Sequence, residues 1–171
     1  MSAPLPAGAT IGIIGGGQLG RMLAMAAARL GYRTLVLEPQ DDCPAAQTVN
    51  RQITATYDDA GALAQLAREC AVVTYEFENV PVEAARALAA DVPVLPPPQV
   101  LEMAQDRLVE KTRLNAMGIS TARFVAVDND EDLAAGLSAF GGDGVLKTRR
   151  LGYDGKGQRV FRKAGAGEAA G

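Results

Sequence analysis

The chain has 171 residues, which is enough for one full domain and part of another. Its net charge of -3 gives no reason to expect nucleic-acid or membrane binding, since both favour basic patches. Histidine is absent, and the two cysteines, Cys43 and Cys70, make neither a disulfide framework nor a zinc site. Histidine-based catalysis is therefore excluded for this chain, and any metal would be a hard cation held by carboxylates and phosphates. Because the apolar runs are too short to span a bilayer and no signal peptide is evident, the cytoplasm is the expected location.

The first hundred residues alternate between strand and helix patterns. Short apolar runs predict strands at residues 10–14, 33–37, 52–56, 72–77 and 92–95, and helical spacing or capping residues predict helices at 18–30, 58–70 and 81–89. The first of these helices carries its apolar side chains at helical spacing, at Leu19, Met22, Leu23, Ala26 and Leu30. This alternation predicts an α/β fold, namely a doubly wound parallel sheet with helices on both faces.

A run of three prolines at residues 96–98 is the candidate boundary region. After it the patterns predict helices at 99–104, 106–117 and 130–140, strands at 123–127, 145–148 and 159–162, and a glycine-rich loop at 151–158. We therefore expect one complete domain over residues 1–105 and the start of a second over residues 106–171.

The first glycine loop fits the pattern G-x-G-x-x-G from Gly15 to Gly20, directly after a strand and at the start of a helix. Glu38 ends the next strand, where a carboxylate could hold a ribose hydroxyl. Glycines at this place let backbone N–H groups approach a phosphate at the helix N-terminus. For this segment alone a dinucleotide, another phosphate ligand and a tight packing turn without a ligand all remain open.

The second glycine loop follows a lysine that lies in an apolar strand. Lys147 needs an anionic partner there to offset its desolvation. Gly152, Gly155 and Gly157 leave a loop with many free N–H groups that can fold over phosphates, and Lys156 adds a positive charge. Protein kinases place their glycine loop before the lysine, which is the reverse order. The alternative interpretation is a solvated basic hairpin.

The order of lysine and loop resembles the ATP-grasp superfamily. Four segments resemble the 5-(carboxyamino)imidazole ribonucleotide synthase family within it: Gly-Gly-Gly-Gln-Leu-Gly-Arg-Met at 15–22, Tyr-Glu-Phe-Glu-Asn-Val at 75–80, Asp-Arg-Leu-Val-Glu-Lys at 106–111 and Leu-Lys-Thr-Arg-Arg-Leu-Gly-Tyr-Asp-Gly-Lys-Gly-Gln at 146–158. Each motif is shared with sister ligases, but the four together and in order are specific. The resemblance implies a pre-ATP-grasp domain followed by the first lobe of an ATP-grasp domain.

The resemblance also implies a reaction. ATP and bicarbonate would give an activated carboxyl group, which is transferred to the exocyclic amine of aminoimidazole ribonucleotide with release of ADP and phosphate. The implied cofactors are ATP and Mg²⁺, and the implied assembly is a homodimer. No nucleic acid and no membrane are expected as partners.

Roles carry over to the matching positions. The residues implied to hold ATP are Arg107, Lys147, Gly152, Tyr153, Asp154, Gly155, Lys156, Gly157 and Gln158. The residues implied to bind the ribonucleotide are Gln18, Leu19, Glu78 and Glu76, and Glu78 is the stronger assignment of the two acids. Asp154 would lie between the loop and the substrate amine, as the catalytic group. The first glycine loop would then hold a mononucleotide phosphate, and Glu38 would lose its ribose role.

The chain departs from the family in length. The segments that the family uses for adenine, for acidic Mg²⁺ ligands and for the substrate phosphate are not found after Gln158. We therefore expect an N-terminal fragment that makes no product by itself and contributes no metal ligand. Two rival functions are a nicotinamide-dependent oxidoreductase, based on the first glycine loop and Glu38, and a non-catalytic nucleotide-binding fragment.

Overall fold

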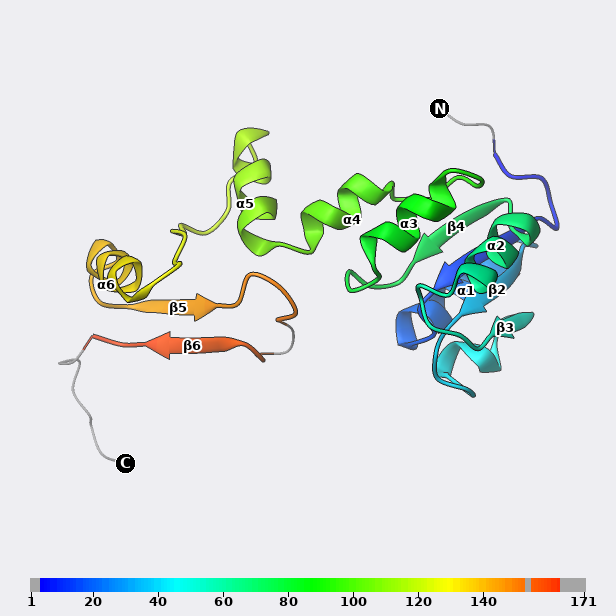
Figure 1. Cartoon of the computed structure of the whole chain (residues 1–171), viewed down its shortest axis with the longest axis horizontal. Helices are drawn as coiled ribbons and strands as arrows, with labels where there is room; N and C mark the ends of the chain where they lie inside the picture. The colour runs from blue at the N-terminus through cyan, green and yellow to red at the C-terminus, as the bar shows by residue number, and fades with distance from the viewer. Residues whose placement is uncertain (1–3, 153–154, 164–171) are drawn as a thin grey trace. The chain divides into compact units, whose positions relative to one another are not determined.

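The structure, a computed structural model, describes residues 4–152 and 155–163. The chain divides into two compact units, Met1–Glu102 and Met103–Gly171, each of which is described by itself (Figure 1).

The first unit is built on a four-stranded parallel sheet. Its strands are β1 (Thr10–Ile14), β2 (Arg33–Leu37), β3 (Arg51–Ile53) and β4 (Val72–Tyr75), in the spatial order β3-β2-β1-β4. The last three residues of β1 and the last four of β2 are buried, as their continuous apolar sequences predict for strands covered on both faces. The strand predicted at residues 92–95 is reduced to a single parallel bridge between Val94 and Val73.

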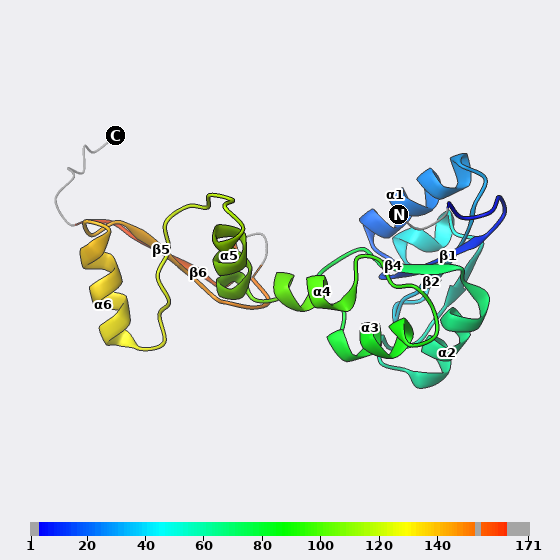
Figure 2. The ribbon, with the colours of Figure 1, turned by 90° about the horizontal axis from the view of Figure 1, so that it is seen from above.

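Helices cover both faces of this sheet, as expected for a doubly wound fold (Figure 2). On one face lie α1 (Gln18–Arg29) and the short 3-10 helix η1 (Pro44–Gln47), and on the other lie α2 (Ala60–Glu69) and α3 (Val82–Ala89). Asp59 caps α2, because its carboxylate accepts a hydrogen bond from the N–H of Ala62 at 2.7 Å.

α1 does not bury the apolar side chains whose spacing predicted it. Its apolar stripe is largely exposed, with Leu19 at 56% and Met22 at 57% relative exposure. The buried positions are instead Gly20, Ala24 and Ala27. Small side chains let the helix backbone lie close to the sheet and to η1, and the larger apolar side chains then have no room on that side.

The second unit contains helices and one antiparallel hairpin. α4 (Pro98–Ala104) crosses the division between the units, and α5 (Arg107–Ala116), α6 (Asp130–Ala139), β5 (Gly144–Lys147) and β6 (Gln158–Phe161) follow. Asp106 caps α5 and Asn129 caps α6 through their side-chain oxygens. The prediction of a strand at residues 123–127 is wrong, because this stretch has no partner strand within the part of the chain that the structure describes.

The two units differ in their cores. All fully buried hydrophobic side chains among the described residues lie between Ile13 and Leu101. Among the described residues from Met103 onward, only Gly136 is buried. No helix in the described ranges is long and apolar enough to cross a membrane.

Candidate functional site

The carboxyl ends of β1 and β4 form the first candidate region. The chain order reverses between these neighbouring strands, and ligands of open α/β sheets bind outside the carboxyl ends at such a switch point. The first glycine loop follows β1, and the segment Glu76–Glu78 follows β4. The fold therefore brings the predicted substrate residues to the carboxyl end of the sheet. These residues are Gln18, Leu19, Glu76 and Glu78.

Glu38, at the same carboxyl end of the sheet, is held by three hydrogen bonds. Its carboxylate accepts from the N–H of Gly16 at 2.8 Å, from the hydroxyl of Tyr57 at 2.6 Å and from the N–H of Gln40 at 3.1 Å. The pKa of Tyr57 is raised, first by burial and then by its hydrogen bond to Glu38, so this phenol remains a neutral donor. Glu38 thus ties β2 to the first glycine loop, and a ribose hydroxyl would have to compete with these donors.

Glu76 also points into the first glycine loop. Its two carboxylate oxygens accept hydrogen bonds from the N–H groups of Gly17 and Gly20. By contrast, Gln18, Leu19 and Glu78 have exposed side chains. The same N–H groups were predicted to hold a phosphate, and here they donate to the protein's own carboxylate.

The β5–β6 hairpin in the second unit forms the second candidate region. A cavity of about 120 Å³ lies at its loop. It is lined by Arg107, Lys147, Thr148, Gly152, Gly155, Lys156, Gly157 and Gln158. Three of these side chains are cationic, and the structure thus brings together every described residue that was predicted to hold ATP. Tyr153 and Asp154 lie outside the described residues, so the predicted catalytic carboxylate is not placed.

Thr148 organises the glycine loop, and no pattern in the sequence singled it out. Its N–H donates to the carbonyl of Gly157 at 2.8 Å. Its Oγ1 lies 2.9 Å from where a Cβ on Gly152 would be, and 2.6 Å from a Cβ on Gly157. The threonine side chain therefore fills the space between the two ends of the loop, and glycine is required on both sides of it.

The start of α5 is attached to the same hairpin. The N–H of Arg107 donates to the carbonyl of Arg149 at 2.9 Å, and its guanidinium reaches the carbonyl of Gly152 at 3.5 Å. Asp106 caps α5 and lies 3.7 Å from the guanidinium of Arg150. These contacts place the Arg107 side chain at the second glycine loop.

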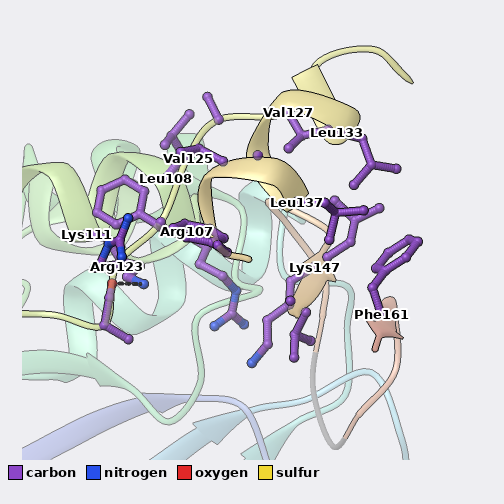
Figure 3. A pocket seen from close by; sticks show the side chains of 18 of the residues that line it. Arg107, Leu108, Lys111, Arg123, Val125, Val127, Leu133, Leu137, Lys147 and Phe161 are labelled. Carbon is purple, nitrogen blue, oxygen red and sulfur yellow. Dashed lines mark hydrogen bonds between the residues drawn. The ribbon is translucent and has the colours of Figure 1, made fainter. Parts of the chain in front are cut away.

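A larger cavity of about 530 Å³ lies in the same unit, between α5, α6 and the hairpin. Figure 3 shows apolar side chains such as Leu133, Leu137 and Phe161 around it, with Arg107 and Lys147 extending toward one side. Because phosphates need cations and N–H donors, the small cationic cavity suits them better than this apolar one. Lys147 is exposed in β5, so the desolvation expected for it is not observed here.

The described residues contain no group of three or more His, Cys, Asp or Glu side chains that could hold a metal ion. The two cysteines in the first unit are both buried and free.

Comparison with known protein families gives two matches along the chain. Residues 8–105 match the ribonucleotide synthetase preATP-grasp domain, and residues 112–170 match the ATP-grasp domain.

Individual relatives carry one recurrent name. The N5-carboxyaminoimidazole ribonucleotide synthase of Brucella melitensis is 66% identical over 154 residues, which are 90% of this chain and 42% of that protein. The protein of the same name from Staphylococcus aureus strain COL is 43% identical over 151 residues, which are 88% of this chain and 40% of that protein. The chain thus spans about two fifths of the length of these relatives.

Solved structures resemble most of the chain. The N5-carboxyaminoimidazole synthetase of Staphylococcus aureus complexed with ADP has a TM-score of 0.87 at 41% identity, covering 94% of this chain and 43% of that one. The N5-carboxyaminoimidazole synthase of Aspergillus clavatus, in complex with ADP and 5-aminoimidazole ribonucleotide, has a TM-score of 0.74 at 30% identity, covering 90% and 40%.

Proposed function

Because this chain belongs to the ribonucleotide synthetase preATP-grasp family, we propose that it carries the ribonucleotide-binding domain and the phosphate loop of an ATP-dependent carbon–nitrogen ligase. In the proposed reaction, bicarbonate and ATP carboxylate the exocyclic amine of 5-aminoimidazole ribonucleotide. The products are N5-carboxyaminoimidazole ribonucleotide, ADP and phosphate. The pathway is purine biosynthesis.

The observation that carries this proposal is the cationic cavity at the β5–β6 loop. Arg107, Lys147 and Lys156 line it together with the loop glycines. In phosphoryl transfer the protein mainly positions the phosphates and stabilises the charge that develops on them. Arg107 and Lys147 would supply positive charge that compensates it, and the loop N–H groups would supply directed donors.

The ribonucleotide is assigned to the carboxyl ends of the strands in the first unit. Gln18, Leu19 and Glu78 expose their side chains there. Asp154 is proposed to orient the substrate amine toward the carboxyl donor, since a positioned acceptor contributes through orientation. The supporting likeness is to a synthase whose structure contains both ADP and the ribonucleotide.

Three further features belong to the proposal. Mg²⁺ would accompany ATP, because it bridges phosphate oxygens in such reactions. The complete enzyme would be a homodimer, and it would act in the cytoplasm.

Ligand-dependent melting tests the proposed function, because a ligand that binds only the native state raises the melting midpoint. ATP with Mg²⁺ and the ribonucleotide, added separately, should each raise the midpoint, whereas NAD should not. Lys147→Ala should abolish the ATP effect, and Lys163→Ala, which removes a lysine outside the cavity lining, should keep it. Asp154→Asn should also keep it, because Asp154 is assigned to the substrate amine.

An NAD effect without an ATP effect would favour the oxidoreductase instead. An ATP effect together with no ribonucleotide effect would favour a nucleotide-binding module of another kind.

A further inference from the structure

The first glycine loop has the sequence of a phosphate site, but it already contains an anion. The N-terminus of α1 has no cap of its own: Gly17 at the N-cap has no side chain, and no acidic residue lies in the first turn. The missing acceptor comes from far along the chain. The carboxylate of Glu76 accepts hydrogen bonds from the N–H groups of Gly17 and Gly20, which are 59 and 56 residues away.

The same carboxylate accounts for the glycines of the motif. A Cβ on Gly15 would lie 2.5 Å from Cγ of Glu76, and a Cβ on Gly17 would lie 2.7 Å from its Oε1. A Cβ on Gly20 would lie 2.6 Å from the carbonyl oxygen of Gly15 and 3.1 Å from Oε2 of Glu76. Side chains at these three positions would therefore displace the carboxylate or the loop backbone.

The remaining glycine of the motif faces the second carboxylate. A Cβ on Gly16 would collide with Sγ of Cys43 and would lie 2.7 Å from Cγ of Glu38. The N–H of Gly16 donates to Glu38 at 2.8 Å. Three N–H groups of the loop are thus engaged by two carboxylates, each from the end of a neighbouring strand.

Binding of an external phosphate to this loop would be unfavourable. Helix N-termini attract anions because their first N–H groups lack partners and because the helix dipole is positive there. At α1 the N–H groups of Gly17 and Gly20 have a partner, and a phosphate would also approach a carboxylate of like charge. The loop offers N–H donors at a helix N-terminus, as a dinucleotide-binding loop does, but the anion that they bind is the protein's own Glu76 carboxylate.

We infer that Glu76 is the internal anion of the first glycine loop, and that it acts as a positioning residue which fixes the start of α1. On this inference a ligand binds to residues that this turn exposes, such as Gln18 and Leu19, and not to the N–H groups of Gly16, Gly17 and Gly20. That the ligand is a ribonucleotide rests on the proposed function. The occupation of the loop by Glu76 does not.

Anion rescue in the 171-residue chain tests this inference. Glu76→Ala removes the acceptor and leaves the N–H groups of Gly17 and Gly20 exposed at the helix N-terminus. Its melting midpoint should fall by roughly 10 °C. Inorganic phosphate at about 50 mM should recover about half of that loss, because the vacated turn becomes an anion site.

The wild-type chain and Glu83→Ala are the controls, since Glu83 is an exposed acid that pairs with Arg86 on the surface. In both, phosphate should move the midpoint only by its general stabilising effect on folded proteins. An equal phosphate effect in all three proteins, or an unchanged midpoint for Glu76→Ala, overturns the inference.

Glu76→Gln keeps the inference testable if the alanine variant does not fold. Glutamine preserves size but has one acceptor oxygen, so it cannot accept from both N–H groups in the way a carboxylate does. In NMR spectra the amide protons of Gly17 and Gly20 should lie downfield in the wild-type chain and move upfield in Glu76→Gln. If these two resonances do not move, Glu76 is not their acceptor.

Ligand binding separates this inference from the proposed function. In a chain that binds the ribonucleotide, Glu76→Ala should weaken ribonucleotide affinity by about tenfold and leave ATP affinity unchanged. Selective phosphate rescue without any ribonucleotide binding to the wild-type chain would refute the proposed function and support the internal anion. Ribonucleotide binding without selective phosphate rescue would support the proposed function and refute the internal anion.

Discussion

Two tyrosines of the first unit have hydroxyl groups in opposite circumstances. Tyr57 donates to Glu38 at 2.6 Å, whereas the hydroxyl of Tyr75 is buried and has no hydrogen-bond partner among the described residues. A lost hydrogen bond to a charged group destabilises, and an unsatisfied buried hydroxyl already costs free energy. Tyr57→Phe should lower the unfolding free energy by roughly 1–2 kcal/mol, and Tyr75→Phe should raise it by up to about 1 kcal/mol. Urea unfolding of the two variants measures both, and losses of similar size would contradict the assignment.

Thr148 and Gly152 should be coupled through the space they share. A Cβ on Gly152 would lie 2.9 Å from Oγ1 of Thr148, and Gly152 does not need a left-handed conformation. Gly152→Ala should therefore weaken ATP binding by roughly tenfold, by pushing the loop away from Thr148. Adding Thr148→Ala should restore most of the affinity, because the colliding oxygen is gone.

The matched comparison is Gly157→Ala, which adds backbone strain to the same kind of collision because Gly157 has φ +69°. Thr148→Ala should rescue this variant only in part. If the double variants bind ATP no better than the single ones, as isothermal titration would show, Thr148 does not set the position of the loop.

Cys70 makes the first unit sensitive to alkaline pH. Burial raises the pKa of the Cys70 thiol from 9.0 to about 12. In the unfolded chain the thiol ionises near 9.0, so between these values the folded state binds more protons than the unfolded state. The contribution of this group to stability is complete below pH 9 and falls as the pH rises toward 12, by up to about 1.4 kcal/mol per pH unit.

Urea unfolding at a series of pH values from about 8 to 10 measures this slope. Cys70→Ala should flatten it, since alanine has no proton to lose. An equal slope in the variant would assign the effect to other groups.

At the scale of elements, α1 packs through its small residues. Ala24 is fully buried and packs in the cluster that contains Ile13 and Val36, whereas Met22 is 57% exposed. Ala24→Leu should destabilise the first unit by about 1–3 kcal/mol, because overpacking displaces the helix from the sheet. Met22→Ala on the same helix should change stability by no more than about 0.5 kcal/mol. Thermal unfolding followed by circular dichroism compares them, and the opposite ranking would mean that the apolar stripe is the packed face.

At the scale of the whole chain, the two units should differ in local stability. β1 and β2 are the inner strands of a sheet with buried side chains. Among the described strands, β5 pairs only with β6, and it alternates between half-buried and exposed residues. A hairpin with little buried apolar surface opens readily. Amide hydrogen exchange in β5 should be faster than in β1 and β2 by roughly two orders of magnitude or more. Equal protection in the three strands would contradict this expectation.

Local signals in the sequence were sufficient for most elements and for the position of the second glycine loop. Strand and helix periods, prolines and glycines act within a few residues, so most elements of both units were predicted with small shifts at their ends. The exceptions are the strands expected at residues 92–95 and 123–127, and the short helix η1, which was not predicted. Most residues that line the small cavity at the β5–β6 loop could also be predicted from the sequence, because Lys147 and the loop that ends at Gln158 are nearly contiguous. Arg107 was predicted from a family motif and not from its distance along the chain to the other residues of the cavity.

Tertiary structure decided the features that depend on distant partners. The glycine fingerprint between Gly15 and Gly20 reads the same whether a phosphate or a carboxylate fills it, and only the pairing of β1 with β4 brings Glu76 to the loop. Likewise, an apolar stripe on α1 indicates a helix but does not say which face meets the sheet. Periodicity reports the kind of element, whereas packing depends on the shape of what lies opposite, and that is fixed only when the chain is folded.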